Sequence, residues 1–202
     1  MANRMSRRAL LRSLVGAGLA VPAAAATEPA GAVETSRGEC YAQTAAARRA
    51  LEPAAAIFIG DAVGTGAQSA LSMRLGAATQ VKLGPEARLR VDRFVANAGG
   101  VLILERGGMI YDHDPGSGPS DVAVRGPFGL LAVRGTRFFA GPSNDVFGVF
   151  VERGAVTVVG QNTSVVVNSG FGTDIARPGA EPEPPHAWGA ARIASAMASV
   201  NP

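Results

Sequence analysis

The alternation of apolar and polar residues is clearest in residues 71–92, which read LSMRLGAATQVKLGPEARLRVD. The apolar members that stand at alternate positions are Leu71, Met73, Leu75, Val81, Leu83, Leu89 and Val91. A period of two gives a strand one apolar face and one polar face. The segment therefore predicts three half-buried β-strands joined by glycine-containing turns.

The same period continues on both sides of this segment, from about Gly38 to Ala176. Further strands are predicted at 101–105, 121–125, 129–133, 136–140, 146–152, 155–159 and 163–168. Arg153-Gly154, between two of these strands, indicates a hairpin turn. No amphipathic helix lies between the strands, which argues against βαβ units. We expect a single all-β domain of many short antiparallel strands, arranged as a sandwich, a roll or a solenoid-like stack.

The segments around this domain have a different composition. Residues 27–37 are small and polar and predict a flexible lead-in, and the alanine-rich run Ala45–Leu51 predicts a short helix before the sheet. The all-β domain is expected to cover residues 38–178.

A proline-rich acidic linker, residues 179–186, precedes a C-terminal tail, residues 187–202. Ile193, Met197 and Val200 would share one face of a helix in this tail. A single apolar stripe usually packs on its own domain, so we favour docking of this helix over capture of a partner.

The N-terminus has the pattern of an export signal. Arg7 and Arg8 precede an apolar run, Ser13–Ala26, which ends in four alanines. Paired arginines before a short apolar run are typical of a twin-arginine signal peptide. We expect residues 1–26 to be removed and the mature chain to reside in the periplasm or outside the cell, without spanning a membrane. An uncleaved membrane anchor is the alternative.

The charge balance argues against nucleic-acid binding. The chain of 202 residues has 19 basic and 16 acidic residues, and four of the basic ones lie in the first 26 residues, which contain no acid. The remainder, with 15 basic and 16 acidic residues, has no electrostatic attraction for phosphate.

Sequence signals for metals and catalysis are weak. Asp112 and Asp114 alternate as carboxylates do in calcium loops, but the spacing of an EF-hand is absent and Asp-Pro-Gly is common in turns. Of the two histidines, His186 lies in the proline-rich linker and is expected far from the strands, so no histidine cluster that could bind a metal is predicted. Nucleophile motifs are absent, so we expect no enzyme and no cofactor.

Cys40, the one cysteine, is expected to point inward from a strand, with a disulfide-linked dimer as the less favoured alternative.

The segment Arg134-Gly135-Thr136-Arg137 is the candidate binding site. Arg134 and Arg137 could donate to an anionic ligand or a protein partner. Alternatively, Gly135 and Thr136 shape a bend and Arg134 pairs with an acid such as Asp145 or Glu152. The second, structural reading is favoured.

Four segments, in the same order, resemble the FecR domain. They are Ile59–Gly66 (IGDAVGTG), Leu71–Leu75 with Val81–Leu89, Leu131–Phe138 (LAVRGTRF) and Val149–Val156 (VFVERGAV). Ala87 stands where the family usually has serine. The resemblance extends over roughly Gly38 to Pro178.

The resemblance implies a periplasmic all-β domain. In its namesakes this domain senses the state of an outer-membrane iron-citrate receptor and passes it to a sigma factor. Those proteins carry an N-terminal anti-sigma segment and a membrane helix, whereas here only Met1–Arg8 precede Ala9-Leu10-Leu11 and the apolar run that follows. We therefore expect a free-standing, non-catalytic binding or sensing module, with an envelope protein or a small anionic ligand as its partner. A glycan-binding or carbohydrate-active envelope protein, and a structural module that assembles through strand edges, are the alternatives.

Overall fold

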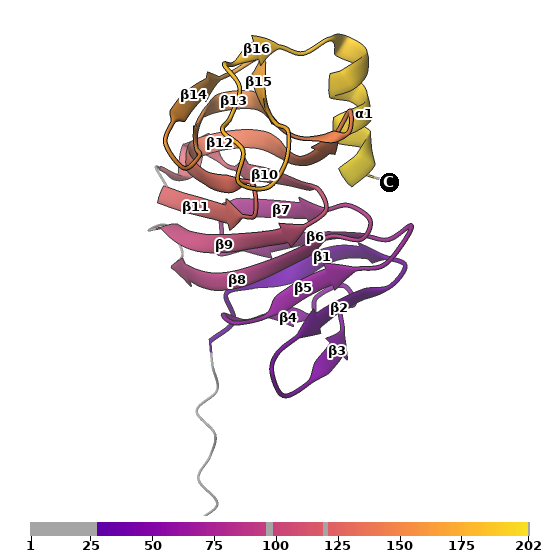
Figure 1. Ribbon diagram of the computed structural model, residues 1–202. Helices are drawn as coiled ribbons and strands as arrows, with labels where there is room; N and C mark the ends of the chain where they lie inside the picture. Colours follow the sequence, from indigo (N-terminus) through magenta and orange to yellow (C-terminus); the bar gives the residue numbers. More distant parts are fainter. Residues whose placement is uncertain (1–27, 96–98, 119–120, 202) are drawn as a thin grey trace, which may run out of the picture.

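The computed structural model describes residues 28–95, 99–118 and 121–201, which form a stack of β-strands with one helix beside its C-terminal end (Figure 1). The elements are β1 Gly31–Arg37, β2 Cys40–Gln43, β3 Arg48–Ala50, β4 Ala56–Ile57, β5 Ala62–Thr65, β6 Ala70–Leu75, β7 Thr79–Leu83, β8 Arg88–Val95, β9 Gly99–Arg106, β10 Met109–His113, a 3-10 turn Pro115–Ser117, β11 Asp121–Gly126, β12 Gly129–Ser143, β13 Val146–Val159, β14 Ser164–Asn168, β15 Phe171–Ile175, β16 His186–Ala187 and α1 Ala190–Val200. The predicted all-β class and the C-terminal helix are confirmed.

All the strands belong to one sheet with two arms that meet at β12. One arm runs outward from β12 in the order β11, β9, β8, β5, β2 and β3, and the other in the order β10, β7, β6, β1 and β4. The chain crosses from arm to arm as it rises from the indigo N-terminal strands to the yellow helix (Figure 1). Neighbouring strands are antiparallel except β9 and β11, which are parallel.

The main hydrophobic core lies between the two arms. Leu75 and Val81, from β6 and β7, are buried in the same cluster as Leu89 and Leu102, from β8 and β9. These side chains belong to the alternating apolar positions, so the period of two places one face of each arm in a shared core.

A long hairpin formed by β12 and β13 joins the arms. The predicted strands 129–133 and 136–140 are one strand, β12, and the predicted turn at Arg153-Gly154 lies inside β13. That prediction was wrong, since the glycine belongs to an irregularity of the ladder rather than to a turn. The true turn is Asn144-Asp145, where both residues have positive φ, 53° and 63°. Positive φ at both positions is typical of two-residue hairpins.

Two predictions near the N-terminus need correction. Gly31–Arg37, expected within a flexible lead-in, form strand β1, which pairs with β4 and β6 and buries Val33. The expected helix Ala45–Leu51 is absent, and strand β3 lies there instead. Thr44 closes the β2–β3 turn by accepting from the backbone N–H of Ala46 and Ala47, so tertiary pairing overrides the helical propensity of the alanines.

The C-terminal tail docks on the outer face of β10, β12 and β13. Trp188 is 6% exposed and packs on Phe150, with ring centroids 5.5 Å apart, and against the edge of Phe139. Ala196 and Val200, from α1, complete this second cluster. The favoured docking of the tail is thus observed. No helix in the described residues is long and apolar enough to cross a membrane.

Candidate binding sites

The Arg134–Arg137 segment forms an irregular corner of the β12–β13 ladder. The pairing register shifts between Arg134 and Arg137, and Gly135 has a φ of +59°. Thr136 is fully buried, and a side chain at the facing Gly154 would meet its methyl group. Glycine at these positions allows positive φ and close approach of the strands. Gly135 and Thr136 therefore shape a bend in the ladder, as the structural alternative predicted for these two residues.

Arg137 is held by two carboxylates at this corner. Its Nε donates to Glu152 and its Nη1 to Asp112, both at 2.6 Å. Burial lowers the pKa of Arg137, but hydrogen bonds to Glu152 and Asp112 outweigh it and raise that pKa. Arg153 also donates to Asp112, at 2.8 Å. The network joins β10, β12 and β13, so Arg137 has little capacity left for an anionic ligand.

The role of Arg134 stays a prediction, because its side chain lies outside what the structure describes. Its backbone pairs with Asp121 and Ala155. Arg7 and Arg8 of the predicted signal peptide also lie outside the described residues.

The two weak metal candidates have other partners. Asp112 is bound by Arg137 and Arg153, as described above. Asp114 caps the 3-10 turn: its carboxylate accepts from the Gly116 N–H at 2.9 Å and from the Ser117 hydroxyl at 3.2 Å. These hydrogen bonds, led by that from Gly116, lower the pKa of Asp114. The buried His113 ring lies 3.0 Å from both the Thr79 hydroxyl and the Gly118 carbonyl. The side chains of Asp114 and His113 therefore form hydrogen bonds that stabilise the loop around the 3-10 turn.

Cys40 is buried, as predicted, with its sulfur 3.3 Å from the Ala70 carbonyl oxygen. Burial raises the pKa of its thiol. A buried thiol with a raised pKa is poorly placed for an intermolecular disulfide.

One cluster of potential metal ligands was missed in the sequence. Asp174, Glu183 and His186 place ligand atoms within 4.8 Å of one another, because β16 pairs with β15. The prediction that His186 lies far from the strands was therefore wrong. Asp174 already accepts two hydrogen bonds from Arg192, at 2.7 and 2.9 Å, and Arg192 stacks on Trp188. This carboxylate therefore fastens the tail, and a metal would have to displace Arg192.

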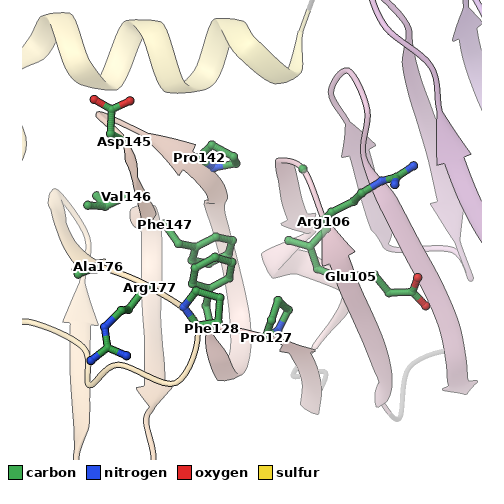
Figure 2. A pocket seen from close by; sticks show the side chains of 13 residues that line it. Glu105, Arg106, Pro127, Phe128, Pro142, Asp145, Val146, Phe147, Ala176 and Arg177 are labelled. Carbon is green, nitrogen blue, oxygen red and sulfur yellow. The ribbon is translucent and has the colours of Figure 1, made fainter.

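An apolar pocket of about 440 Å³ opens where the β11–β12 turn meets the start of β13. Phe128 and Phe147 stack at its centre, with ring centroids 4.3 Å apart and planes 8° apart (Figure 2). Three prolines also line it, Pro127, Pro142 and Pro178. This volume and an apolar lining are typical of sites that bind a ligand or a partner's side chain.

Charged groups surround the pocket without entering it. The Arg106 and Arg177 guanidinium groups point away from the stacked rings (Figure 2), and among the described residues neither has an ion pair. Asp145 lies on the same rim and is exposed. The fourth charged residue, Glu105, is engaged by Arg88 and Arg90 at 2.8 and 2.7 Å. Burial raises the pKa of Glu105, but the hydrogen bonds from Arg90 and Arg88 outweigh it and lower that pKa.

Two carboxylates line this pocket, Glu105 and Asp145, and hydrolysis of a glycan would need a pair of carboxyl groups to act together. Such chemistry needs one carboxyl with a raised pKa close to a second, free carboxylate. Glu105 shows the opposite behaviour, since two arginines hold it ionised. Glu105 is therefore poorly suited to act as a general acid, and the pocket presents an apolar centre with charged groups around it.

Comparison with known proteins agrees with this architecture. Residues 61–157 match the family model described as FecR protein. Two crystal structures of a candidate anti-sigma factor from Parabacteroides distasonis share the fold, each with a TM-score of 0.55. They are 15% and 14% identical to the chain; each match covers 67% of this chain and 64% or 63% of the other, slightly under two thirds. At such identity the similarity concerns the fold. No curated protein matches the chain in sequence.

Proposed function

We propose that the chain is an exported, non-catalytic sensing module that works by binding another envelope protein, because residues 61–157 match the family model described as FecR protein. The family and the fold shared with a candidate anti-sigma factor support a regulatory role. The observation that carries the binding role is the pocket at Phe128 and Phe147.

The anatomy of this pocket favours a protein partner over a small anion. Protein interfaces combine an apolar centre with a charged or polar rim. Phe128 and Phe147 form such a centre, whereas Arg106 and Arg177 direct their charges outward from it (Figure 2). The partner would insert an apolar side chain between the prolines and meet both arginines with acidic groups at the rim.

A site-specific photo-crosslinker tests the proposal in cells. A photoreactive phenylalanine at Val146, which lines the pocket, should crosslink an envelope protein, and Phe128→Ser should remove that product. The control position is Ile59, which is 48% exposed and lies outside the pocket. A crosslink that persists in Phe128→Ser, or that forms equally well from position 59, would contradict the assignment of the pocket.

Export is the second part of the proposal. Arg7 and Arg8 before the apolar run Ser13–Ala26 support transport by the twin-arginine route, which accepts folded proteins. Replacement of both arginines by lysine should leave the chain inside the cell, as fractionation would show. Normal export of that variant would refute the twin-arginine assignment without affecting the assignment of the pocket.

A further inference from the structure

Strand β14 forms an open edge of the sheet. Ser164–Asn168 pair with Val159–Ala155 of β13 on one side, and in the described part of the chain no strand pairs with the other side. The neighbouring β15 differs, because β16 covers it at Phe171 and Gly172. An uncovered edge offers backbone hydrogen-bonding groups to another strand.

The hairpin geometry shows which backbone groups face the open side. Gly160 N–H donates to the Thr163 carbonyl at 2.8 Å and closes the β13–β14 turn. Hydrogen-bonded and non-bonded pairs alternate along an antiparallel ladder, so Val165 and Val167 are bonded to β13. The N–H and C=O groups of Ser164, Val166 and Asn168 therefore point away from the sheet.

The edge lacks two of the features that usually prevent strand pairing, namely charged side chains and prolines. Charged side chains, prolines, bulges and short length are the usual protections of an edge. The twenty residues from Gly154 to Thr173 include no charged side chain and no proline. Val166 is 55% exposed on this strand, and Phe171 is 44% exposed just beyond it.

We propose that β14 pairs with β14 of a second copy of this chain, antiparallel and with Val166 opposite Val166. In this register Ser164 faces Asn168 of the second copy. The outward-facing N–H and C=O groups of each strand then lie opposite outward-facing C=O and N–H groups of the other strand. A twofold axis can pass through Val166 because its own N–H and C=O face outward. The absence of charge means that no like-charged side chains meet across the axis.

This inference stands apart from the proposed function, because β14 does not line the pocket at Phe128 and Phe147. A single pair of short strands buries little area, so we expect a weak dimer, with dissociation in the micromolar range or above. The pairing would form a continuous sheet across both copies.

Sedimentation of the purified full chain between about 1 and 500 µM tests the inference. Wild type should shift from monomer to dimer with concentration. Val166→Pro should abolish the shift and still fold, because proline at this position removes an N–H that makes no bond to β13. Val166→Lys should weaken association by at least about tenfold. Ala132→Lys, on the same outer face but inside the sheet, is the control and should associate like wild type.

A cysteine scan in a Cys40→Ala background tests the register. Val166→Cys should form an intermolecular disulfide on oxidation, since paired residues in a ladder lie within disulfide range. Ser164→Cys should form far less, because its own counterpart would lie four residues away along the partner strand. A wild type that stays monomeric throughout the range, or a dimer that Val166→Pro and Val166→Lys leave unchanged, would overturn the proposal.

Discussion

At the N-terminal end of the sheet the two outer strands are short and one of them, β3, is charged, whereas at the C-terminal end the outer strand β14 carries no charge. Strand β3 has three residues, two of them Arg48 and Arg49, and β4 has two residues. Arg48 forms an exposed ion pair with Glu39, and Arg49 reaches the buried carboxylate of Asp61. Both arginines of β3 therefore form ion pairs at the N-terminal end of the sheet.

The C-terminal end is stabilised by apolar contacts instead. Trp188 and helix α1 cover Phe139 and Phe150 on one face, but the edge of β14 stays open. The difference shows that covering a face and closing an edge are separate requirements for a sheet. At the N-terminal end, short strands and charge disfavour pairing with a further strand. At the C-terminal end, β14 can still pair with one.

The largest effect is expected at the apolar end, from Trp188→Ala. Removal of a buried aromatic ring that packs on Phe139 and Phe150 should lower the free energy of unfolding by about 3–5 kcal/mol. Urea denaturation would measure this loss. Phe171→Ala, which removes a half-exposed ring, is the control and should cost much less. If Trp188→Ala cost as little as Phe171→Ala, the docked tail would contribute little to the free energy of unfolding.

At the charged end the largest effect is expected from Asp61→Ala. The carboxylate of Asp61 is buried, accepts from the Phe58 N–H at 2.9 Å and pairs with Arg49. Its removal leaves both donors without their acceptor and should lower the free energy of unfolding by about 2–3 kcal/mol in urea denaturation. Asp61→Asn keeps an acceptor for Phe58 and should cost less. Equal costs for the two variants would contradict this account.

A smaller effect is expected from acid. The hydrogen bond from Gln80 lowers the pKa of Glu34, burial opposes it, and hydrogen bonds from Ser72 and Arg74 add to the lowering. A lowered folded-state pKa gives stability that is present above about pH 4.5 and is lost as the pH falls through the lowered value. Urea midpoints measured across this range should fall less steeply in Glu34→Gln. A slope equal to that of wild type would contradict the role of Glu34, and the exposed Glu52→Gln is the matched control.

The smallest effect on stability is expected from Arg48→Val. Its ion pair with Glu39 is exposed and its guanidinium stacks on Tyr41, so the shift in thermal midpoint should correspond to a loss of about 1 kcal/mol or less. The variant makes the N-terminal edge resemble β14 more closely, so sedimentation should detect new association. A variant that remains as monomeric at this edge as wild type would show that short length, rather than charge, protects β3.

The sequence predicted strands best where each strand has one face in the core and one in water. Residues 71–92 have that character, and they form β6, β7 and the start of β8. Strand β10 was missed because both of its faces are covered: Tyr111 points into the main core, and Ile110 lies in the cluster under the helix. Alternation disappears when a strand is buried on both faces.

The apolar pocket could not be predicted from the sequence, since the two rings at its centre come from different elements. Phe128 lies in the turn between β11 and β12, and Phe147 lies at the start of β13. An aromatic residue directly after Pro127 in an exposed turn was the available signal. The Arg134–Arg137 segment, by contrast, was recognisable as a corner because glycine marks the positive φ that a bulge requires.

The β12–β13 hairpin also has a consequence for the order of folding. Its two strands are joined by the two-residue turn Asn144-Asp145, so their pairing requires little loop closure. Each arm, by contrast, also needs pairs between strands far apart in the chain, such as β1 with β6 and β5 with β8. Each arm begins on β12, so neither can be completed before that strand is in place. We therefore expect the hairpin to belong to the folding nucleus, and substitutions at its turn to slow refolding more than they speed unfolding.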